Sequence, residues 1–166
     1  MAQHGLYDLT GAVVAVVGGG SGIGEAVALG AAEHGAIVTV LDANKTAATA
    51  VAARLGGDGA AGELDIRDGR AVGETLAALA RDRGRLDAVI CTPSINVRKP
   101  ILQYTDEDFD RVVTLNLKGS FHVVQAAGRV MTAQRSGSII VFSSIRSQVV
   151  EPGQSVYAAT KAGIVQ

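Results

Sequence analysis

The sequence predicts an α/β fold, a doubly wound parallel sheet with helices on both faces. Short apolar runs rich in β-branched residues alternate with longer segments of helical pattern along the chain. A glycine-rich turn separates the first apolar run from the first helical segment. Polar residues follow the ends of several apolar runs, which is where the ligand crevice of an open parallel sheet lies.

The expected strands and helices alternate strictly. The strands are expected at 12–17, 37–41, within 59–66, at 88–91 and at 138–142. The helices are expected at 23–34, 45–55, 69–83 and 106–133, and a last one begins near Val156. Asn44, Asp68 and Thr105 each stand where a side chain can cap the helix that follows. Segment 92–104 contains two prolines and is expected to be irregular.

The composition indicates a globular protein of 166 residues, which we expect to form a single domain, 1–166. The formal net charge of −1 gives no electrostatic reason to expect a nucleic-acid or membrane partner. No apolar run is long enough to cross a bilayer, and the first ten residues lack a signal-peptide pattern.

The cysteine and histidine residues predict neither a disulfide nor a metal site. The single cysteine, Cys91, is expected to be a buried apolar residue, which fits a reducing, cytoplasmic compartment. His4, His34 and His122 are scattered along the chain, so we expect them at the surface or in packing contacts.

Residues 18–24 read Gly-Gly-Gly-Ser-Gly-Ile-Gly and join the first strand to the first helix. Glycines let the backbone turn sharply and approach a pyrophosphate, and the helix that follows presents free N–H groups to the anion. A plain strand-to-helix turn is the alternative, but the strand–turn–helix context favours a dinucleotide site. The expected cofactor contacts in this loop are Gly18, Ser21, Gly22, Ile23 and Gly24.

Carboxylates follow the second and third expected strands. Asp42 can accept hydrogen bonds from both hydroxyls of an adenosine ribose, and it repels a 2′-phosphate. Because no Lys or Arg lies at 19–21 or at 43, the sequence predicts NAD rather than NADP. The alternative for Asp42 is a cap of the turn before Lys45. Asp65 can accept a hydrogen bond from the adenine amino group, and Ile66 beside it completes this part of the site.

A tyrosine and a lysine lie four residues apart at the start of the last helical segment. Tyr157 and Lys161 therefore share one helix face, and an ammonium near a phenol favours the phenolate, which can act as a general base. Ser144 follows the fifth strand, and its hydroxyl can hold a substrate oxygen. Asn116 lies inside the long helix 106–133, where a poor helix former needs a reason such as a kink or a held water. A Tyr-x-x-x-Lys pair alone is usually a surface feature, but the combination with the glycine loop predicts an active site.

On these residues the sequence resembles the short-chain dehydrogenase/reductase family, which has a Rossmann fold. The resemblance extends from the glycine loop to Tyr-Ala-Ala-Thr-Lys-Ala-Gly at 157–163. It implies that Tyr157 exchanges a proton with the substrate oxygen, and that Lys161 binds the nicotinamide ribose and activates Tyr157. It implies that Ser144 orients the substrate and that Asn116 completes a proton relay through water. The implied reaction is hydride transfer between the nicotinamide and a secondary alcohol or ketone.

The sequence departs from the family pattern in three respects. The glycine loop begins with Val17-Gly18 in place of Thr-Gly, and segment 91–94 reads Cys-Thr-Pro-Ser in place of Asn-Asn-Ala-Gly. Ser94 thus adds a Cβ where the backbone is expected to pass close to the cofactor. The third departure is length, because the resemblance implies a Rossmann fold truncated after the start of the helix that follows strand five. Later strands would then be missing, and strand five would be an exposed edge.

The first functional prediction is an NAD-dependent alcohol dehydrogenase or ketone reductase. Segments 95–100 and 144–147 are similar to those of family members that act on sugar acids or polyols. Arg98, Lys99 and Arg146 can bind a substrate carboxylate or can be solvated loop cations. The alternatives are a 3-oxoacyl-thioester reductase and a non-catalytic nucleotide-binding or assembly module. We also expect a homo-oligomer, a dimer or a tetramer, because segment 106–133 is apolar on more than one face.

Overall fold

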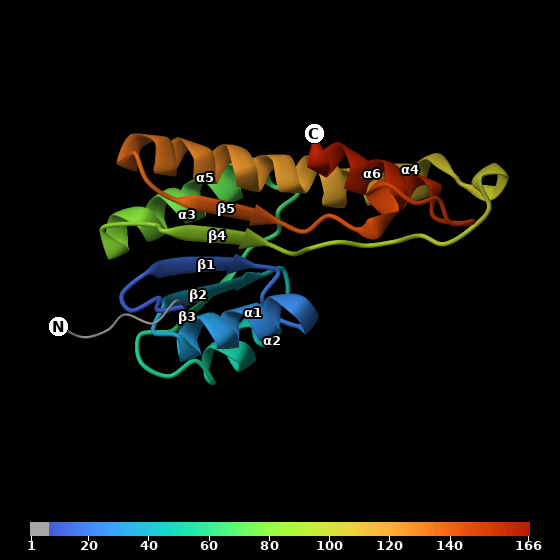
Figure 1. Ribbon diagram of the computed structural model, residues 1–166. Helices are drawn as coiled ribbons and strands as arrows, with labels where there is room; N and C mark the ends of the chain where they lie inside the picture. The colour runs from blue at the N-terminus through green and yellow to red at the C-terminus, as the bar shows by residue number, and fades with distance from the viewer. Residues whose placement is uncertain (1–6) are drawn as a thin grey trace.

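The computed structural model describes residues 7–166, which form a five-stranded parallel sheet with helices on both faces (Figure 1). The expected absence of a signal peptide rests largely on residues 1–6, which lie outside the described residues, as does His4.

The sheet has the topology that the sequence predicts. Its strands are β1 (Val13–Val17), β2 (Ile37–Asp42), β3 (Ala60–Glu63), β4 (Ala88–Cys91) and β5 (Ser138–Val141). Their order is β3-β2-β1-β4-β5, and every neighbouring pair is parallel. The chain moves outward from β1 to β3 and then crosses back to β4, so the switch in strand order lies between β1 and β4. The carboxyl ends of these two strands therefore flank the crevice in which such sheets bind ligands.

The helices agree with the predicted ones to within three residues at each end, apart from the long helix. They are α1 (Gly22–Glu33), α2 (Lys45–Ala52), α3 (Gly69–Arg83), α4 (Asp106–Val113), α5 (Ser120–Gln134) and α6 (Ser155–Val165). The 3₁₀ turns η1 (Ile101–Gln103) and η3 (Ile145–Ser147) lie in connecting segments. All three predicted caps form, because the side chains of Asn44, Asp68 and Thr105 accept backbone N–H groups of the first turns.

The prediction of one regular helix over 106–133 is wrong. A π-helix, η2 (Thr114–Gly119), separates α4 from α5. Asn116 lies inside this wider turn and is fully buried. The sequence had indicated that an asparagine at this position needs a local irregularity, and the π-helix is that irregularity. Such insertions occur frequently at functional sites.

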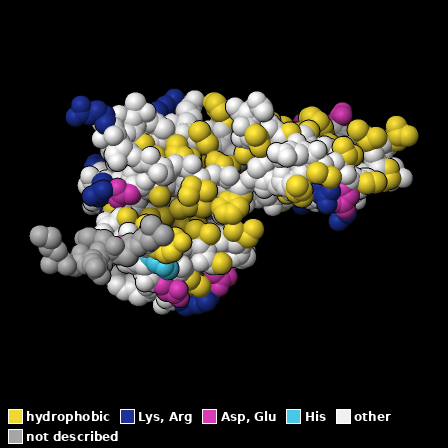
Figure 2. All heavy atoms as spheres, viewed as in Figure 1, with side chains coloured by type: hydrophobic (Ala, Val, Ile, Leu, Met, Phe, Trp, Pro, Cys, Tyr) yellow, Lys and Arg dark blue, Asp and Glu magenta, His cyan; other side chains and the backbone are white. Residues whose placement is uncertain are grey.

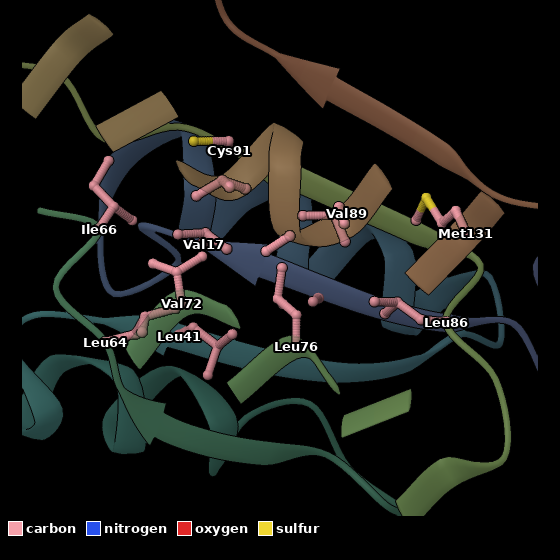
Figure 3. Close-up of a cluster of buried hydrophobic side chains, with 14 of the residues drawn as sticks. Val17, Leu41, Leu64, Ile66, Val72, Leu76, Leu86, Val89, Cys91 and Met131 are labelled. Atoms are coloured by element: carbon pink, nitrogen blue, oxygen red, sulfur yellow. The ribbon is translucent and has the colours of Figure 1, made fainter. Parts of the chain in front are cut away.

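Two apolar cores cover the two faces of the sheet. One lies under α1 and α2 and contains Val16 and Val40. The other lies under α3 and α5 and has Ile66 and Cys91 at one end, with Met131 at the other end (Figure 3). Cys91 is 1% exposed, as predicted, and burial raises the pKa of its thiol to about 11.

One sheet surface is open. Helices α1 and α2 lie over β1, β2 and β3, while no helix within residues 7–166 covers β4 and β5 on that side (Figure 1). Ile140 of β5 is 50% exposed there, and Figure 2 shows apolar side chains in the middle of this view. Among residues 7–166, strand β5 pairs with β4 alone, so it is an edge strand of the described sheet.

Candidate active site

The glycine loop is folded tightly against the ends of two strands. The N–H groups of Gly18 and Gly19 both donate to the carbonyl oxygen of Leu41, at 2.7 and 3.2 Å. Gly18 has φ +78°, in the left-handed region, and a Cβ there would lie 2.6 Å from Oγ1 of Thr92. A Cβ on Gly24 would lie 2.1 Å from the carbonyl oxygen of Gly18. Only glycine fits at these two positions, because backbone and neighbouring side chains occupy the space.

The loop forms one wall of a cleft of about 470 Å³ at the carboxyl ends of the strands. Its lining includes Gly18, Ser21, Gly22, Ile23, Gly24, Asp42, Ala43, Leu64, Asp65, Ile66, Thr92, Pro93, Ser94 and Leu115. The structure thus brings together all the predicted cofactor contacts except Tyr157 and Lys161, which do not line this cleft. The Ser21 side chain does not cap α1, so it leaves the N–H groups of the first turn for a bound anion.

Asp42 holds the turn before α2 and also lines the cleft. Its Oδ2 accepts the N–H of Gly20 and its Oδ1 accepts the N–H of Asn44, each at 2.9 Å. The carboxylate therefore fixes both the glycine loop and the turn before α2. It also lines the cleft, and each oxygen has a further lone pair that can accept a ribose hydroxyl.

Asp65 lies on the cleft wall next to a partner that sequence reasoning missed. The guanidinium of Arg67 donates from Nε and Nη2 to the Asp65 carboxylate, at 2.9 and 2.5 Å. This hydrogen bonding holds the pKa of Asp65 below its ordinary value of 3.8. The wall therefore carries an ionised carboxylate that can accept a hydrogen bond. The two-residue spacing of Asp65 and Arg67, just after β3, was the signal in the sequence for this ion pair.

Residues 92–94, which depart from the family pattern, still join the loop to β4. The Thr92 hydroxyl lies 3.1 and 3.0 Å from the carbonyl oxygens of Val17 and Gly18. The ring of Pro93 occupies the space beside Gly18. Ser94 is exposed and lines the cleft, so its added Cβ lies on the cleft wall.

Asn116 connects three separate segments. Its Oδ1 accepts the N–H of Ile95 at 2.9 Å, and its Nδ2 donates to the carbonyl oxygen of Ile95 at 2.8 Å. The same Nδ2 donates to Oγ1 of Thr160 in α6 at 3.2 Å. Both amide hydrogens are thus used inside the protein, and the side chain joins η2, the 92–100 loop and α6.

The predicted tyrosine–lysine pair forms on α6. Nζ of Lys161 lies 5.7 Å from the centroid of the Tyr157 ring and donates to the carbonyl oxygen of Phe142 at 2.7 Å. Lys161 is only 3% exposed, and burial lowers its pKa below the ordinary value of 10.5. The Ser143 hydroxyl donates to the carbonyl oxygen of Lys161 and so ties α6 to the end of β5. The half-buried Tyr157 ring therefore has an ammonium group close to it.

Ser144 lies after β5, where it accepts the N–H of Arg146 at 3.2 Å and caps η3. Within residues 7–166 no hydrogen bond joins Ser144 to Asn116, Tyr157 or Lys161. The structure therefore links three of the four predicted catalytic residues through α6, and it places Ser144 on the neighbouring segment.

The three loop cations are all paired with carboxylates, so they are neither free nor simply solvated. Arg98 and Arg146 both pair with Glu151, and Lys99 pairs with Asp108. Arg98 and Glu151 are 53 residues apart in the sequence, and the two closer pairs do not have helical spacing, so the sequence pattern did not indicate these contacts.

The described part of the chain offers no cluster of three or more His, Cys, Asp or Glu side chains that could hold a metal ion. Nδ1 of His34 lies 2.8 Å from the carbonyl oxygen of Gly30, and Nδ1 of His122 lies 2.8 Å from that of Ile66. Both are surface or packing histidines, as predicted. None of the helices in residues 7–166 has the length and apolar character of a membrane span.

Comparison with known proteins connects this geometry to a family. A family profile described as short chain dehydrogenase matches residues 12–166. D-threitol dehydrogenase of Mycolicibacterium smegmatis is 33% identical over 162 residues, which cover 96% of this chain and 62% of that protein. (3R)-3-hydroxyacyl-CoA dehydrogenase of Homo sapiens is 36% identical over 177 residues, covering 99% and 68%.

The solved structures agree. The crystal structure of an NAD⁺-bound xylitol dehydrogenase superposes with a TM-score of 0.91 at 31% identity, covering 95% of this chain and 62% of that one. The chain thus spans about two thirds of the length of these relatives. With its doubly wound Rossmann sheet and a profile match over nearly its whole length, the chain belongs to the short-chain dehydrogenase family.

Proposed function

We propose that this protein is an NAD-dependent oxidoreductase that interconverts a secondary alcohol and a ketone, with residues 1–166 acting as one dinucleotide-binding domain. The observation that carries the proposal is the buried Lys161 ammonium, 5.7 Å from the Tyr157 ring centroid. Burying an ammonium is costly, so its position beside a phenol favours a catalytic role over a structural one. The glycine-loop cleft supports a dinucleotide site, because the loop lines it beside the N-terminus of α1, where free N–H groups can bind a pyrophosphate.

Each of the four polar residues has a role in the proposed reaction. When bound in the glycine-loop cleft, NAD would supply the hydride acceptor for the oxidation and NADH the hydride donor for the reduction. The phenolate of Tyr157 takes the hydroxyl proton in the oxidation and gives it back in the reduction. Lys161 favours the phenolate and would bind the nicotinamide ribose, and the Ser144 hydroxyl would orient the substrate oxygen. Asn116 belongs to the proposed proton relay, and its side chain holds α6 and the 92–100 loop at the correct separation.

Replacing the phenol tests the proposed chemistry. Tyr157→Phe keeps the ring and removes the proton, so it is expected to abolish turnover and leave NADH binding nearly unchanged. Lys161→Ala is expected to reduce both, because it removes the ribose contact as well as the charge. NADH absorbance with a panel of polyols, sugar acids and 3-hydroxyacyl thioesters measures turnover. Turnover by Tyr157→Phe at the wild-type rate contradicts the proposal.

The cofactor preference is proposed to be NAD over NADP because of Asp42. Calorimetric titration with NADH and NADPH is expected to give tighter binding of NADH. Asp42→Ala combined with Ala43→Arg is expected to narrow or reverse this preference. Ala43→Arg alone is the control, because Asp42 also holds the N–H groups of Gly20 and Asn44. Tighter binding of NADPH by the wild-type protein contradicts the assignment.

The substrate class is proposed to be a polyol or a sugar acid, with a 3-oxoacyl thioester as the second candidate. The similarity to D-threitol dehydrogenase and to xylitol dehydrogenase supports the first class. The similarity to (3R)-3-hydroxyacyl-CoA dehydrogenase supports the second. Tight NADH binding without turnover of any of these compounds favours a non-catalytic nucleotide-binding or assembly module.

A homo-oligomer, a dimer or a tetramer, in the cytoplasm is also part of the proposal. Leu117, Phe121 and Val124 are 36%, 57% and 41% exposed at helical spacing along η2 and α5, which is an apolar stripe suited to a second copy. The unpaired Cys91 thiol supports a reducing compartment. For the wild-type protein, light scattering that shows only monomer at micromolar concentration contradicts the oligomer. The variant Phe121→Asp places a charge on the apolar stripe and is expected to be monomeric.

A further inference from the structure

His122 lies on α5, outside the residues that line the cleft, but it contacts the cleft wall directly. Its Nδ1 lies 2.8 Å from the carbonyl oxygen of Ile66. A carbonyl oxygen only accepts hydrogen bonds, so Nδ1 carries the proton and donates it. Ile66 lines the cleft together with Asp65. The imidazole is therefore bonded to the backbone of the segment that follows β3, at a distance of 56 residues in sequence.

Two glycines leave room for the side chains of His122 and Ile66 to pack against neighbouring backbone. A Cβ on Gly69 would lie 2.9 Å from Cδ2 of His122, so the imidazole ring packs on the bare backbone where α3 begins. A Cβ on Gly119 would lie 2.7 Å from Cδ1 of Ile66, so the Ile66 side chain packs on the bare backbone of η2. The Ile66 side chain is 2% exposed. The segment is thus held on two sides, by packing at its side chain and by a hydrogen bond at its carbonyl group.

We propose that His122 is a positioning residue for the adenine end of the cofactor, because it fixes the Asp65–Ile66 part of the cleft wall. The inference rests on the proposed binding of NAD. Asp65 is the carboxylate expected to accept the adenine amino group, and its place on the wall depends on the backbone that His122 holds. The imidazole touches neither the cofactor nor the reacting atoms, and it acts through the carbonyl group of Ile66.

Substitutions at position 122 separate the hydrogen bond from the packing. His122→Phe keeps a ring over Gly69 but removes the donor. His122→Asn restores a donor, since rotation about χ2 can bring its Nδ2 to the position of Nδ1 of histidine. The matched control is His34→Phe, because His34 makes the same bond to a carbonyl group at the far end of α1, 2.8 Å from Gly30, where it is exposed.

Calorimetric titrations of the full chain with AMP, NMN and NAD⁺ measure the effect at each end of the cleft. For His122→Phe, AMP and NAD⁺ are expected to bind about five- to tenfold more weakly, the effect of one lost hydrogen bond, with NMN unchanged. His122→Asn is expected to bind AMP within about twofold of wild type, and His34→Phe to match wild type. Unchanged AMP affinity in His122→Phe overturns the proposal. Equal losses for AMP and NMN overturn it as well, because they indicate general destabilisation.

A second readout does not depend on the cofactor. In His122→Phe, the amide protons of Arg67 and Asp68, which bond to Asp65, are expected to exchange faster with deuterium by about five- to tenfold. Unchanged exchange there overturns the proposal. If the wild-type protein binds neither NAD⁺ nor AMP, the proposed function fails, and the exchange measurement still decides whether His122 holds this wall.

Discussion

The glycine at position 24 provides the sharpest test of the cleft geometry. A Cβ placed there would lie 2.1 Å from the carbonyl oxygen of Gly18 and 2.9 Å from Cα of Gly19. Both neighbours are backbone atoms, so no side chain can rotate to make room. Because ordinary contact begins at 3.4 Å, Gly24→Ala forces the loop and α1 apart by about 1 Å.

The expected cost follows from this displacement. Overpacking that shifts the backbone typically destabilises a protein by about 1–3 kcal/mol. We expect Gly24→Ala to lower the free energy of unfolding by this amount. The same movement changes the distance between Gly18 and the first turn of α1, which together form the proposed pyrophosphate site. NAD⁺ affinity is therefore expected to fall by at least about tenfold, which corresponds to ~1.4 kcal/mol.

The same helix provides a matched control. Gly30 also lies in α1, but a Cβ there would meet nothing within 4 Å. Gly30→Ala is therefore expected to stabilise the protein by about 0.5–1 kcal/mol, because alanine is the better helix former. Urea unfolding followed by circular dichroism measures both variants, and calorimetry measures NAD⁺ binding. Equal stabilities of Gly24→Ala and Gly30→Ala, or wild-type NAD⁺ affinity in Gly24→Ala, would refute the reasoning.

Further predictions concern three buried residues. Asn116→Ala leaves both backbone groups of Ile95 without partners, so urea unfolding is expected to show a loss of about 2–3 kcal/mol; a loss below about 0.5 kcal/mol contradicts the bonding pattern. The lowered pKa of Lys161 means that the unfolded chain binds more protons between that pKa and 10.5, so stability is expected to rise with pH through this window. Lys161→Met is expected to lack this rise. If the free energy of unfolding has the same pH dependence in both proteins, the proposed effect of burying Lys161 is contradicted. Cys91, whose pKa is raised to about 11, is expected to react with a thiol reagent at neutral pH only after unfolding, and rapid labelling of the folded protein contradicts this.

The sheet and most helices could be predicted because their signals are local. Strands β1, β2 and β4 are short apolar runs, and the caps at Asn44 and Asp68 are single polar side chains next to the helices they cap. The alternation of strands and helices indicated a parallel sheet covered on both faces. The π-helix at Thr114–Gly119 could not be predicted in this way, because it depends on tertiary contacts of Asn116 with Ile95 and Thr160.

The cleft could be predicted for the same reason, since its residues follow strand ends and converge at one edge of the sheet. Contacts between segments distant in sequence could not. The bond between His122 and Ile66 is one example, and the ion pair between Arg98 and Glu151 is another. A side chain that acts on another segment has no periodic or spacing signal, so only the folded structure shows its partner.

The paired cations also bear on the proposed substrate. Glu151 bridges Arg98 and Arg146, and Asp108 neutralises Lys99. The 151–154 segment is tied further to the loop by the bond from Asn96 to Gln154, at 2.8 Å. Because Glu151 and Asp108 offset the charge of these cations, a substrate carboxylate meets less positive charge here than three unpaired cations would present, whereas a hydroxyl group depends less on that charge. Within the proposed function, this arrangement favours a neutral polyol over a sugar acid.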